Sequence, residues 1–338
     1  MSAFADRSPL VCITSSPPLQ DAETNALQGF HDQTIVAKPI TKFAHRVTNV
    51  EEIPRLAAYA YRAANSGIKG PVLLDCPIDV LFSPPQIHRI AYGATLVPPA
   101  YAPAPDPAAL DELSTMWKVA KRPVIITGTG VRDAGDLLAK LAEATNTPVF
   151  YSNKFSSPIG PDHPLRAGPA TALATFAGSE EQPDFVLLLA ARTGFLLAGR
   201  SGAVIPRNCT LAQIDVDGSE IGKSHAVQVG IVADASLFAQ AMLAKARDGS
   251  YQAHDDWIKA CVNLRTRPSP YGNDPKMQDD GQLHPYHALA AVMRAVPHDS
   301  IIIIDGGEAG QWASMTAELA KPHVVIASTG YLGMLGKY

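Results

Sequence analysis

Cysteine is scarce in this 338-residue sequence, and its four positions lie far apart. No two cysteines form a CxxC pair, and no histidines have the HxxxH spacing of a zinc site. A GxSxG nucleophile motif is also lacking. We therefore expect neither a disulfide framework nor a metal ligand set in this chain, and we expect a reducing compartment. The cysteines are Cys12, Cys76, Cys209 and Cys261.

Positive charge is scarce as well. Lys and Arg number 28 against 32 Asp and Glu, which gives a net charge of −4 and a pI near 6.2. A chain without a basic surplus is poorly suited to neutralise phosphates along a nucleic acid, so we expect no nucleic-acid partner. The 46% hydrophobic and 18% charged residues instead indicate a globular protein with buried strands.

Long hydrophobic runs are missing too. Apolar runs such as 185–191 and 301–304 are far short of the roughly 20 residues that a membrane span needs. The first residues do not have the basic and then apolar form of a signal peptide. We expect a cytoplasmic protein without a membrane partner, and the peroxisome and the mitochondrion stay open.

The first region alternates strand and helix signals. Apolar runs at 10–14 and 70–75 predict two short strands, and apolar residues at helical spacing over 49–66 predict a helix with Thr48 as its cap. Strands separated by a crossover helix are typical of a parallel sheet.

Proline-rich and polar stretches divide the rest of the chain. Residues 84–105 contain repeated prolines and predict a stiff linker. A second linker is expected over 247–282, around the helix that holds Trp257. The predicted regions are 1–83, 84–105, 106–246, 247–282 and 283–338.

The region 106–246 predicts a complete α/β domain. Asp106 and Pro107 have the form of an N-cap and first helical residue. Short apolar runs then alternate with helices, which indicates a doubly wound parallel sheet. The predicted strands are 123–127, 148–151, 184–189, 211–215 and 228–232.

Glycines after the first of these strands give only a weak nucleotide-binding signal. Gly128 and Gly130 stand between a strand and a helix, but the third glycine, Gly135, is out of place for a dinucleotide motif. A plain turn is the simpler interpretation. Asp215 and Asp217 follow a later strand, where they could contact a ribose or cap the next helix.

The last region has two glycine-dense loops. Residues 305–311 follow a predicted strand, at 300–305, as a tight turn, and residues 329–336 form the second loop. Successive glycines let backbone N–H groups approach a phosphate at a helix N-terminus. Together the loops suggest a phosphorylated ligand. Gln28, in a polar stretch near the start, has no such signal of its own.

Several stretches resemble thiamine-diphosphate enzymes, the family of acetolactate synthase, 2-hydroxyacyl-CoA lyase and benzaldehyde lyase. The resemblance is strongest to benzaldehyde lyase and runs through nearly the whole chain. It is carried by residues 21–28 (DAETNALQ), 39–47 (PITKFAHRV), 70–79 (GPVLLDCPID), 230–234 (GIVAD), 284–287 (HPYH) and 330–333 (GYLG).

The resemblance implies three Rossmann-like domains with parallel sheets. Residues 1–83 would be the later part of a pyrimidine-binding domain, 106–246 a whole central domain, and 283–338 the start of a diphosphate-binding domain. It also implies thiamine diphosphate and Mg²⁺ as cofactors. Since such enzymes bind the cofactor between subunits, a homodimer or homotetramer is implied.

The same resemblance assigns roles to six residues. Gln28 matches the glutamine that hydrogen-bonds substrate oxygens, and Gly333 the glycine whose carbonyl holds the aminopyrimidine. Leu335 matches the bulky residue that keeps the cofactor bent. The residues near the diphosphate are Gly307, Glu308 and Ala309.

The expected chemistry is C–C bond cleavage or ligation on small aldehydes, 2-hydroxyketones or 2-keto acids. The family's cofactor-activating glutamate would lie before Met1, and its magnesium-binding Gly-Asp-Gly stretch after Tyr338. We therefore expect no metal ligands here and an inactive fragment. The alternative is a non-catalytic remnant, which would either be structural or bind FAD or NAD through its central domain. As a cofactor, FAD is possible but less expected than thiamine diphosphate.

Overall fold

The computed structural model of the chain describes residues 1–21, 24, 31–99, 101–152, 159–247, 250–265, 270–298, 300–322 and 324–327. The chain forms two compact units, Met1–Tyr101 and Ala102–Tyr338, which are described separately below. The division falls inside the segment predicted as a proline-rich linker. The other domain limits given above stay predictions.

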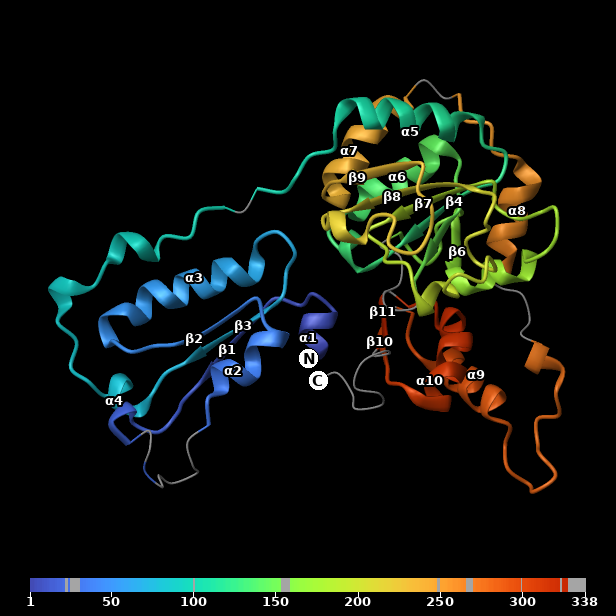
Figure 1. Cartoon of the computed structure of the whole chain (residues 1–338). Helices are drawn as coiled ribbons and strands as arrows, with labels where there is room; N and C mark the ends of the chain where they lie inside the picture. The colour runs from blue at the N-terminus through green and yellow to red at the C-terminus, as the bar shows by residue number, and fades with distance from the viewer. Residues whose placement is uncertain are drawn as a thin grey trace. The chain divides into compact units, whose positions relative to one another are not determined.

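The first unit is built on a three-stranded parallel sheet with the order β1-β3-β2 (Figure 1). Leu56, Ala60 and Ala64 of α3 pack against this sheet, and the short helix α2 contacts β2 and β3. The strands are β1 (Leu10–Thr14), β2 (Phe43–Arg46) and β3 (Pro71–Asp75), and the helices are α1 (Ser2–Ala5), α2 (Gln33–Ala37), α3 (Ile53–Asn65) and α4 (Ile78–Leu81).

Two expectations for this unit need correction. The predicted helix begins as a 3-10 turn at Val50, and its cap is Asn49, whose Oδ1 accepts from the Glu51 N–H at 2.9 Å. Thr48 lies one residue too early to reach the free N–H groups of the first turn. Strand β2 was not predicted, because its four residues, FAHR, are two apolar residues followed by two polar ones, which gives neither an apolar run nor an alternation.

The second unit contains a six-stranded parallel sheet with the order β6-β5-β4-β7-β8-β9. This order reverses direction between β4 and β7, which confirms the predicted doubly wound α/β fold. The strands are β4 (Pro123–Thr127), β5 (Val149–Tyr151), β6 (Arg166–Pro169), β7 (Phe185–Leu189), β8 (Thr210–Asp215) and β9 (Val229–Val232). Strand β6 was missed, since its sequence, RAGP, contains no apolar run.

Helices cover both faces of this sheet. Ile125 of β4 belongs to the core beneath one face, whereas Val124 and Ile126 belong to the core beneath the other. The first core includes α5 (Pro107–Val119), α6 (Gly135–Thr145) and α7 (Ala235–Ala246), and the second includes α8 (Asp255–Leu264). Asp106 caps α5 as predicted, accepting from the N–H groups of Ala108 and Ala109.

The end of the described chain forms a smaller α/β layer. Strands β10 (Ile301–Ile304) and β11 (Val324–Ala327) pair in parallel. Helices α9 (Pro285–Ala295) and α10 (Gly307–Thr316) lie side by side next to them (Figure 1). Their core is small and includes Met293, Ile304 and Ala313.

Candidate active site

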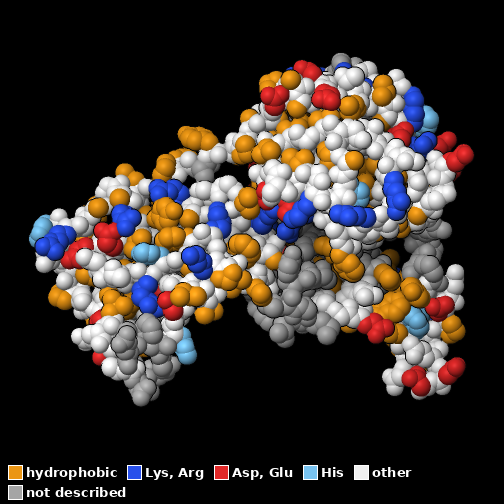
Figure 2. Space-filling view, in the orientation of Figure 1, with side chains coloured by type: hydrophobic (Ala, Val, Ile, Leu, Met, Phe, Trp, Pro, Cys, Tyr) orange, Lys and Arg blue, Asp and Glu red, His pale blue; other side chains and the backbone are white. Residues whose placement is uncertain are grey.

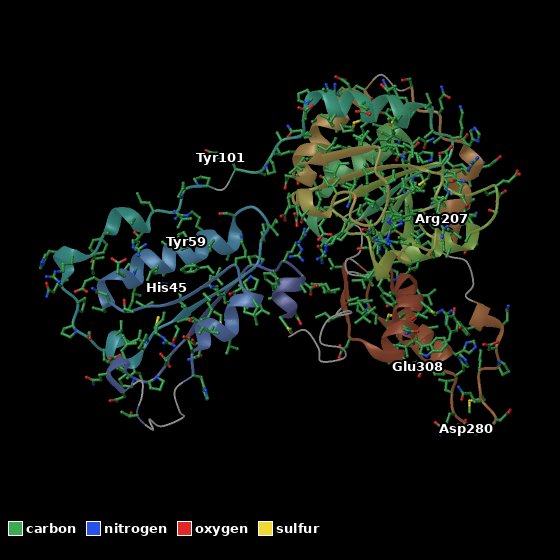
Figure 3. All side chains as sticks on the ribbon, viewed as in Figure 1. His45, Tyr59, Tyr101, Arg207, Asp280 and Glu308 are labelled. Carbon is green, nitrogen blue, oxygen red and sulfur yellow. The ribbon has the colours of Figure 1, made fainter. Side chains whose placement is uncertain are left out.

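The turn between β10 and α10 holds three of the predicted cofactor residues, Gly307, Glu308 and Ala309. Figure 3 labels Glu308 in this region. What was predicted as a tight turn continues directly into α10, which begins at Gly307. Gly307 has φ +78°, a left-handed conformation that favours glycine. The Gly306 N–H donates to Asp305 Oδ1 at 2.7 Å, which closes the turn before the helix starts.

A second glycine fixes how closely α10 approaches β10. A side-chain carbon at Gly310 would lie only 2.1 Å from the backbone oxygen of Asp305. Only glycine lets the first turn of the helix rest on the strand end at this distance. The close approach aligns the helix start with the carboxyl end of β10, where ligands bind in open parallel sheets.

The backbone at the start of α10 is suited to bind a diphosphate, but the charge of the first turn is not. Gly306 is the N-cap and has no side chain to accept from the first N–H groups, which leaves them available to an anion. Glu308, however, is exposed in the same first turn, and its carboxylate would repel a diphosphate. A divalent cation between them would remove that conflict.

The remaining predicted site residues lie outside the described residues. They are Gln28, Gly333 and Leu335. The structure thus brings Gly307, Glu308 and Ala309 together in one turn, and the roles of all six residues stay predictions.

A buried ion pair lies at the carboxyl ends of the first unit's strands, and the sequence analysis missed it. Arg46 Nε donates to Asp75 Oδ2 at 2.7 Å, and Asp75 is fully buried. Asp75 Oδ1 and the hydroxyl of the buried Ser16 have no hydrogen-bond partner in the described part of the chain. Two strands that end in charged residues, PVLLD and FAHR, were the available signal.

The switch point of the six-stranded sheet, between β4 and β7, is closed by backbone packing. A side-chain carbon at Gly128 would lie 1.9 Å from the Ala190 oxygen, and one at Gly130 2.7 Å from Ala190 Cβ. These glycines therefore allow two loops to touch. Asp217 accepts from the Ser219 N–H, which agrees with the capping alternative.

The smaller layer is tied to the six-stranded sheet through a buried triad. Arg166 Nη2 of β6 donates to Glu318 Oε1 at 2.9 Å, and the Tyr151 hydroxyl of β5 donates to the same oxygen at 2.6 Å. Arg166 is fully buried, and Glu318 lies in the 3-10 turn Ala317–Ala320 that follows α10. Burial and the neighbouring Glu318 carboxylate raise the pKa of Tyr151 well above its usual range. The triad holds the end of α10 against the sheet.

An aromatic cluster packs the other side of α10. The Trp312 ring meets Tyr271 edge-on at 4.8 Å and His284 at 5.5 Å between centroids. His284 caps α9, its Nδ1 accepting from the Tyr286 N–H. The cluster joins α9 to α10 and gives no sign of metal binding. No group of three or more His, Cys, Asp or Glu with metal-site geometry occurs among the described residues.

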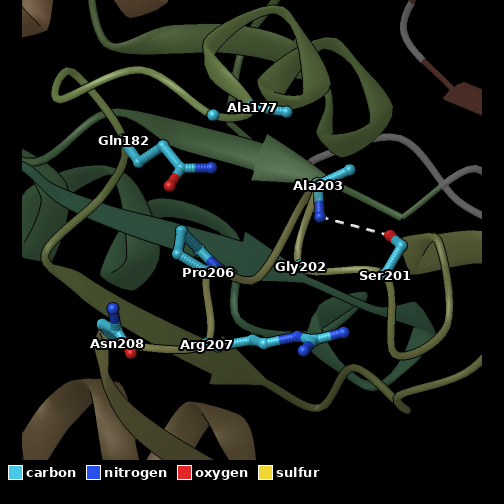
Figure 4. A pocket seen from close by; sticks show the side chains of 9 residues that line it. Ala177, Gln182, Ser201, Gly202, Ala203, Pro206, Arg207 and Asn208 are labelled. Atoms are coloured by element: carbon cyan, nitrogen blue, oxygen red, sulfur yellow. Dashed lines mark hydrogen bonds between the residues drawn. The ribbon is translucent and has the colours of Figure 1, made fainter.

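A surface hollow in the six-stranded domain is seen from close by in Figure 4. It has a volume of about 280 Å³ and is lined by polar residues that include Gln182, Arg207 and Asn208. In the described ranges, no helix combines the length and the apolar character needed to cross a membrane.

Comparison with known proteins finds a family model and several relatives that resemble this chain. Residues 110–242 match the family model described as the thiamine pyrophosphate enzyme, central domain. The chain is 29% identical over 341 residues to the acetolactate synthase isozyme 1 large subunit of Escherichia coli K12, covering 99% of this chain and 58% of that protein. It is 26% identical to the acetolactate synthase large subunit of Lactococcus lactis, with 99% and 57% covered.

A solved structure shares the fold. Benzoylformate decarboxylase from Polynucleobacter necessarius superposes with a TM-score of 0.72 at 19% identity, covering 96% of this chain and 59% of that one. The chain thus spans somewhat less than three fifths of the length of these relatives. Residues 110–242 are therefore similar to the central domain of thiamine pyrophosphate enzymes, and the chain around them is similar to acetolactate synthase large subunits.

Proposed function

We propose that this chain is part of a thiamine-diphosphate-dependent enzyme that makes or breaks a carbon–carbon bond beside a carbonyl group. The observation that carries the proposal is the similarity to acetolactate synthase large subunits over 99% of the chain, outside as well as inside the central domain. The substrate would be a small 2-keto acid, aldehyde or 2-hydroxyketone. The relatives favour 2-keto acids, whereas the stretches 21–28 and 39–47 favour aldehydes through their resemblance to benzaldehyde lyase.

The residues of this chain would bind and orient the cofactor. The free N–H groups at the start of α10 would hold the diphosphate, with Gly307 and Ala309 giving backbone access and Mg²⁺ separating it from Glu308. The Gly333 carbonyl would hold the aminopyrimidine, and Leu335 would keep the cofactor in its bent shape. Thiamine diphosphate, when bound, would supply a nucleophilic ylid carbon and a cationic thiazolium ring that can accept the electron pair of a carbanion.

Gln28 would hydrogen-bond the carbonyl oxygen of the substrate. An amide donor at that oxygen stabilises negative charge as it develops there, which is a large term in carbonyl chemistry. The buried pair of Arg46 and Asp75 stands at the strand ends of the same unit and would keep that end of the sheet rigid.

A complete cofactor site would need more than this chain, and we propose that subunits associate as a homodimer or homotetramer to form it. Titration calorimetry of the purified chain with thiamine diphosphate and Mg²⁺ is expected to show very weak or no binding. Micromolar affinity would contradict an incomplete site.

The decisive test uses the chain together with whatever its genomic flanks encode. If the flanks supply the glutamate and the Gly-Asp-Gly stretch, the extended protein should consume pyruvate or cleave benzoin, and Gln28→Ala should lower kcat/KM at least about tenfold. The control is Gln33→Ala. The Gln33 amide donates to the Ser15 backbone oxygen, away from the proposed role of Gln28. Flanks without both motifs would leave a non-catalytic remnant.

The alternative of a dinucleotide-binding module is not favoured by the structure. The loops that would have to admit a pyrophosphate, at Gly128 and Ala190, are in backbone contact. A flavin absorbance band in the purified protein would support this alternative.

A further inference from the structure

The connection between β7 and β8, together with residues 224–228, lines an open cavity of about 340 Å³ at the amino end of β8 and β9. This is the edge opposite to the carboxyl ends that hold cofactors in such sheets. The connection runs over residues 190–209 and includes a short 3-10 turn, Phe195–Leu197. The cavity is lined by Arg200, Ile205, Pro206, Arg207, Cys209, Leu211, Ser224, His225, Ala226 and Gln228.

The lining carries positive charge without compensation. Arg200 and Arg207 are exposed and form no ion pair or hydrogen bond with any residue that the structure describes, and no carboxylate lines the cavity. Both arginines belong to the lining, which therefore has two positive residues and no negative one. Figure 2 shows Lys and Arg side chains gathered along the margin of this domain, where Figure 3 labels Arg207.

Two carboxylates close in sequence to the cavity's strands have other partners. Glu220 pairs with Lys223 at 3.1 Å. Asp184, which influences the Cys209 thiol, accepts from the backbone N–H groups of Lys121 and Arg122. Neither carboxylate belongs to the lining of the cavity.

The polar groups beside the arginines are also held in place. A side-chain carbon at Gly202, where φ is +83°, would lie 3.5 Å from Arg207 Cγ, so the arginine stem rests on this glycine. Figure 4 shows Arg207 extending past Gly202 along the neighbouring hollow, which shares Pro206 and Arg207 with the cavity. His225 Nδ1 lies 3.0 Å from Ser224 Oγ, and burial together with Arg200 lowers the pKa of His225. The imidazole is thus a neutral hydrogen-bonding group near neutral pH.

We propose that this cavity binds the phosphate group of a small organic phosphate ester. Arg200 and Arg207 match the charge of a dianion, and guanidinium groups bind phosphate through paired N–H donors. The buried side chains of Ile205, Pro206 and Leu211 offer an apolar wall to the ester's carbon atoms. The volume lies at the small end of the range for ligand sites, which fits an ester of a few carbons better than a dinucleotide.

The test titrates the full chain with glycerol 3-phosphate, inorganic phosphate and succinate by calorimetry at pH 7.5. No thiamine diphosphate is present, so the result is independent of the function proposed above. We expect saturable binding of glycerol 3-phosphate, weaker binding of inorganic phosphate, and little binding of succinate. Succinate binding as tightly as the ester would overturn the assignment to phosphate.

Variants locate the site. Arg200→Gln and Arg207→Gln should each weaken ester binding about tenfold or more, because each removes a charge-assisted contact. Arg207→Lys should fall between wild type and Arg207→Gln, since it keeps the charge and loses the paired donors. Arg294→Gln, an exposed arginine on α9, is the matched control and should change affinity less than about twofold. Unchanged affinity in the folded Arg207→Gln protein, or no saturable binding by wild type, would overturn the proposal.

Discussion

Two purely apolar strands in this protein have very different surroundings. In β7, Phe185–Leu189, all five residues are buried between helices on both faces of the six-stranded sheet. In β10, Ile301–Ile304, Ile301 and Ile303 are 63% and 61% exposed, and only the other face has a core. An apolar run therefore indicates a strand in both places, but only the neighbouring elements decide how much stability each side chain provides.

The two regions also differ in what holds them together. The six-stranded domain has two extended cores. The layer of β10 and β11 has one small core and is joined to that domain by the contact of Glu318 with Arg166. We infer that the smaller layer depends on polar links to a degree that the larger domain does not. Mutations can test this difference directly.

The largest effect is expected from Glu318→Ala. Removing the carboxylate leaves the buried Arg166 guanidinium without its counter-charge, which costs about 3–5 kcal/mol of unfolding free energy. Urea unfolding followed by circular dichroism measures the loss. The double variant Arg166→Met with Glu318→Leu removes both charges, and we expect it to be more stable than Glu318→Ala alone. A double variant as unstable as Glu318→Ala would show that packing, not charge, holds the layer.

Next in size is a matched pair of isoleucines from parallel strands. Ile125→Ala in β4 creates a cavity in a fully buried core and should cost about 2–5 kcal/mol. Ile303→Ala in β10 removes a side chain that is 61% exposed and should cost less than about 1 kcal/mol. Equal shifts of the urea midpoint would mean that another surface covers Ile303 in solution.

The sequence predicted most of the architecture because buried parallel strands are runs of apolar residues. It failed at β2 and β6, whose residues, FAHR and RAGP, give no such run and are strands only because their neighbours pair with them. The cap of the 3-10 turn that precedes α3 was misplaced by one residue, because Thr48 and Asn49 are both capping residue types and backbone geometry decides between them.

The site was less accessible to prediction. Glycines at 307 and 310 indicated a special turn, but their reason, a left-handed residue and a helix lying on a strand end, needed coordinates. The triad of Tyr151, Arg166 and Glu318 joins residues up to 167 positions apart, and nothing local indicates it. The arginines at 200 and 207 were ordinary surface residues until the fold placed them around one cavity.

A smaller effect should follow from Gly310→Ala. The added carbon would meet the Asp305 oxygen, so α10 must shift away from β10 at a cost of about 1–3 kcal/mol. Gly93→Ala in the first unit has open space around it and a permitted backbone, so it should not destabilise. Urea unfolding compares the two, and an unaffected Gly310→Ala protein would contradict the close packing of the turn.

The smallest effect is expected from Tyr151→Phe, which removes the hydroxyl of the triad and leaves the ion pair of Arg166 and Glu318 in place. Tyr151→Phe should cost only about 1 kcal/mol at pH 7, because Arg166 still donates to Glu318. The pKa of Tyr151 is raised in the folded chain, whereas tyrosines of the unfolded chain titrate near pH 10. The folded state then holds more protons above that pH, so this contribution is complete below about pH 10 and is lost as the pH rises.

The difference between wild type and Tyr151→Phe should therefore shrink from pH 7 to pH 10.5 in urea unfolding. Cys209, whose pKa burial raises to about 11, destabilises at high pH in the same direction but equally in both proteins, so it cancels in the comparison. Tyr101→Phe, at a side chain that is 92% exposed, is the control and should show no such change. A constant difference across this range would mean that water reaches the Tyr151 hydroxyl, and the link between the two regions would then be an exposed one.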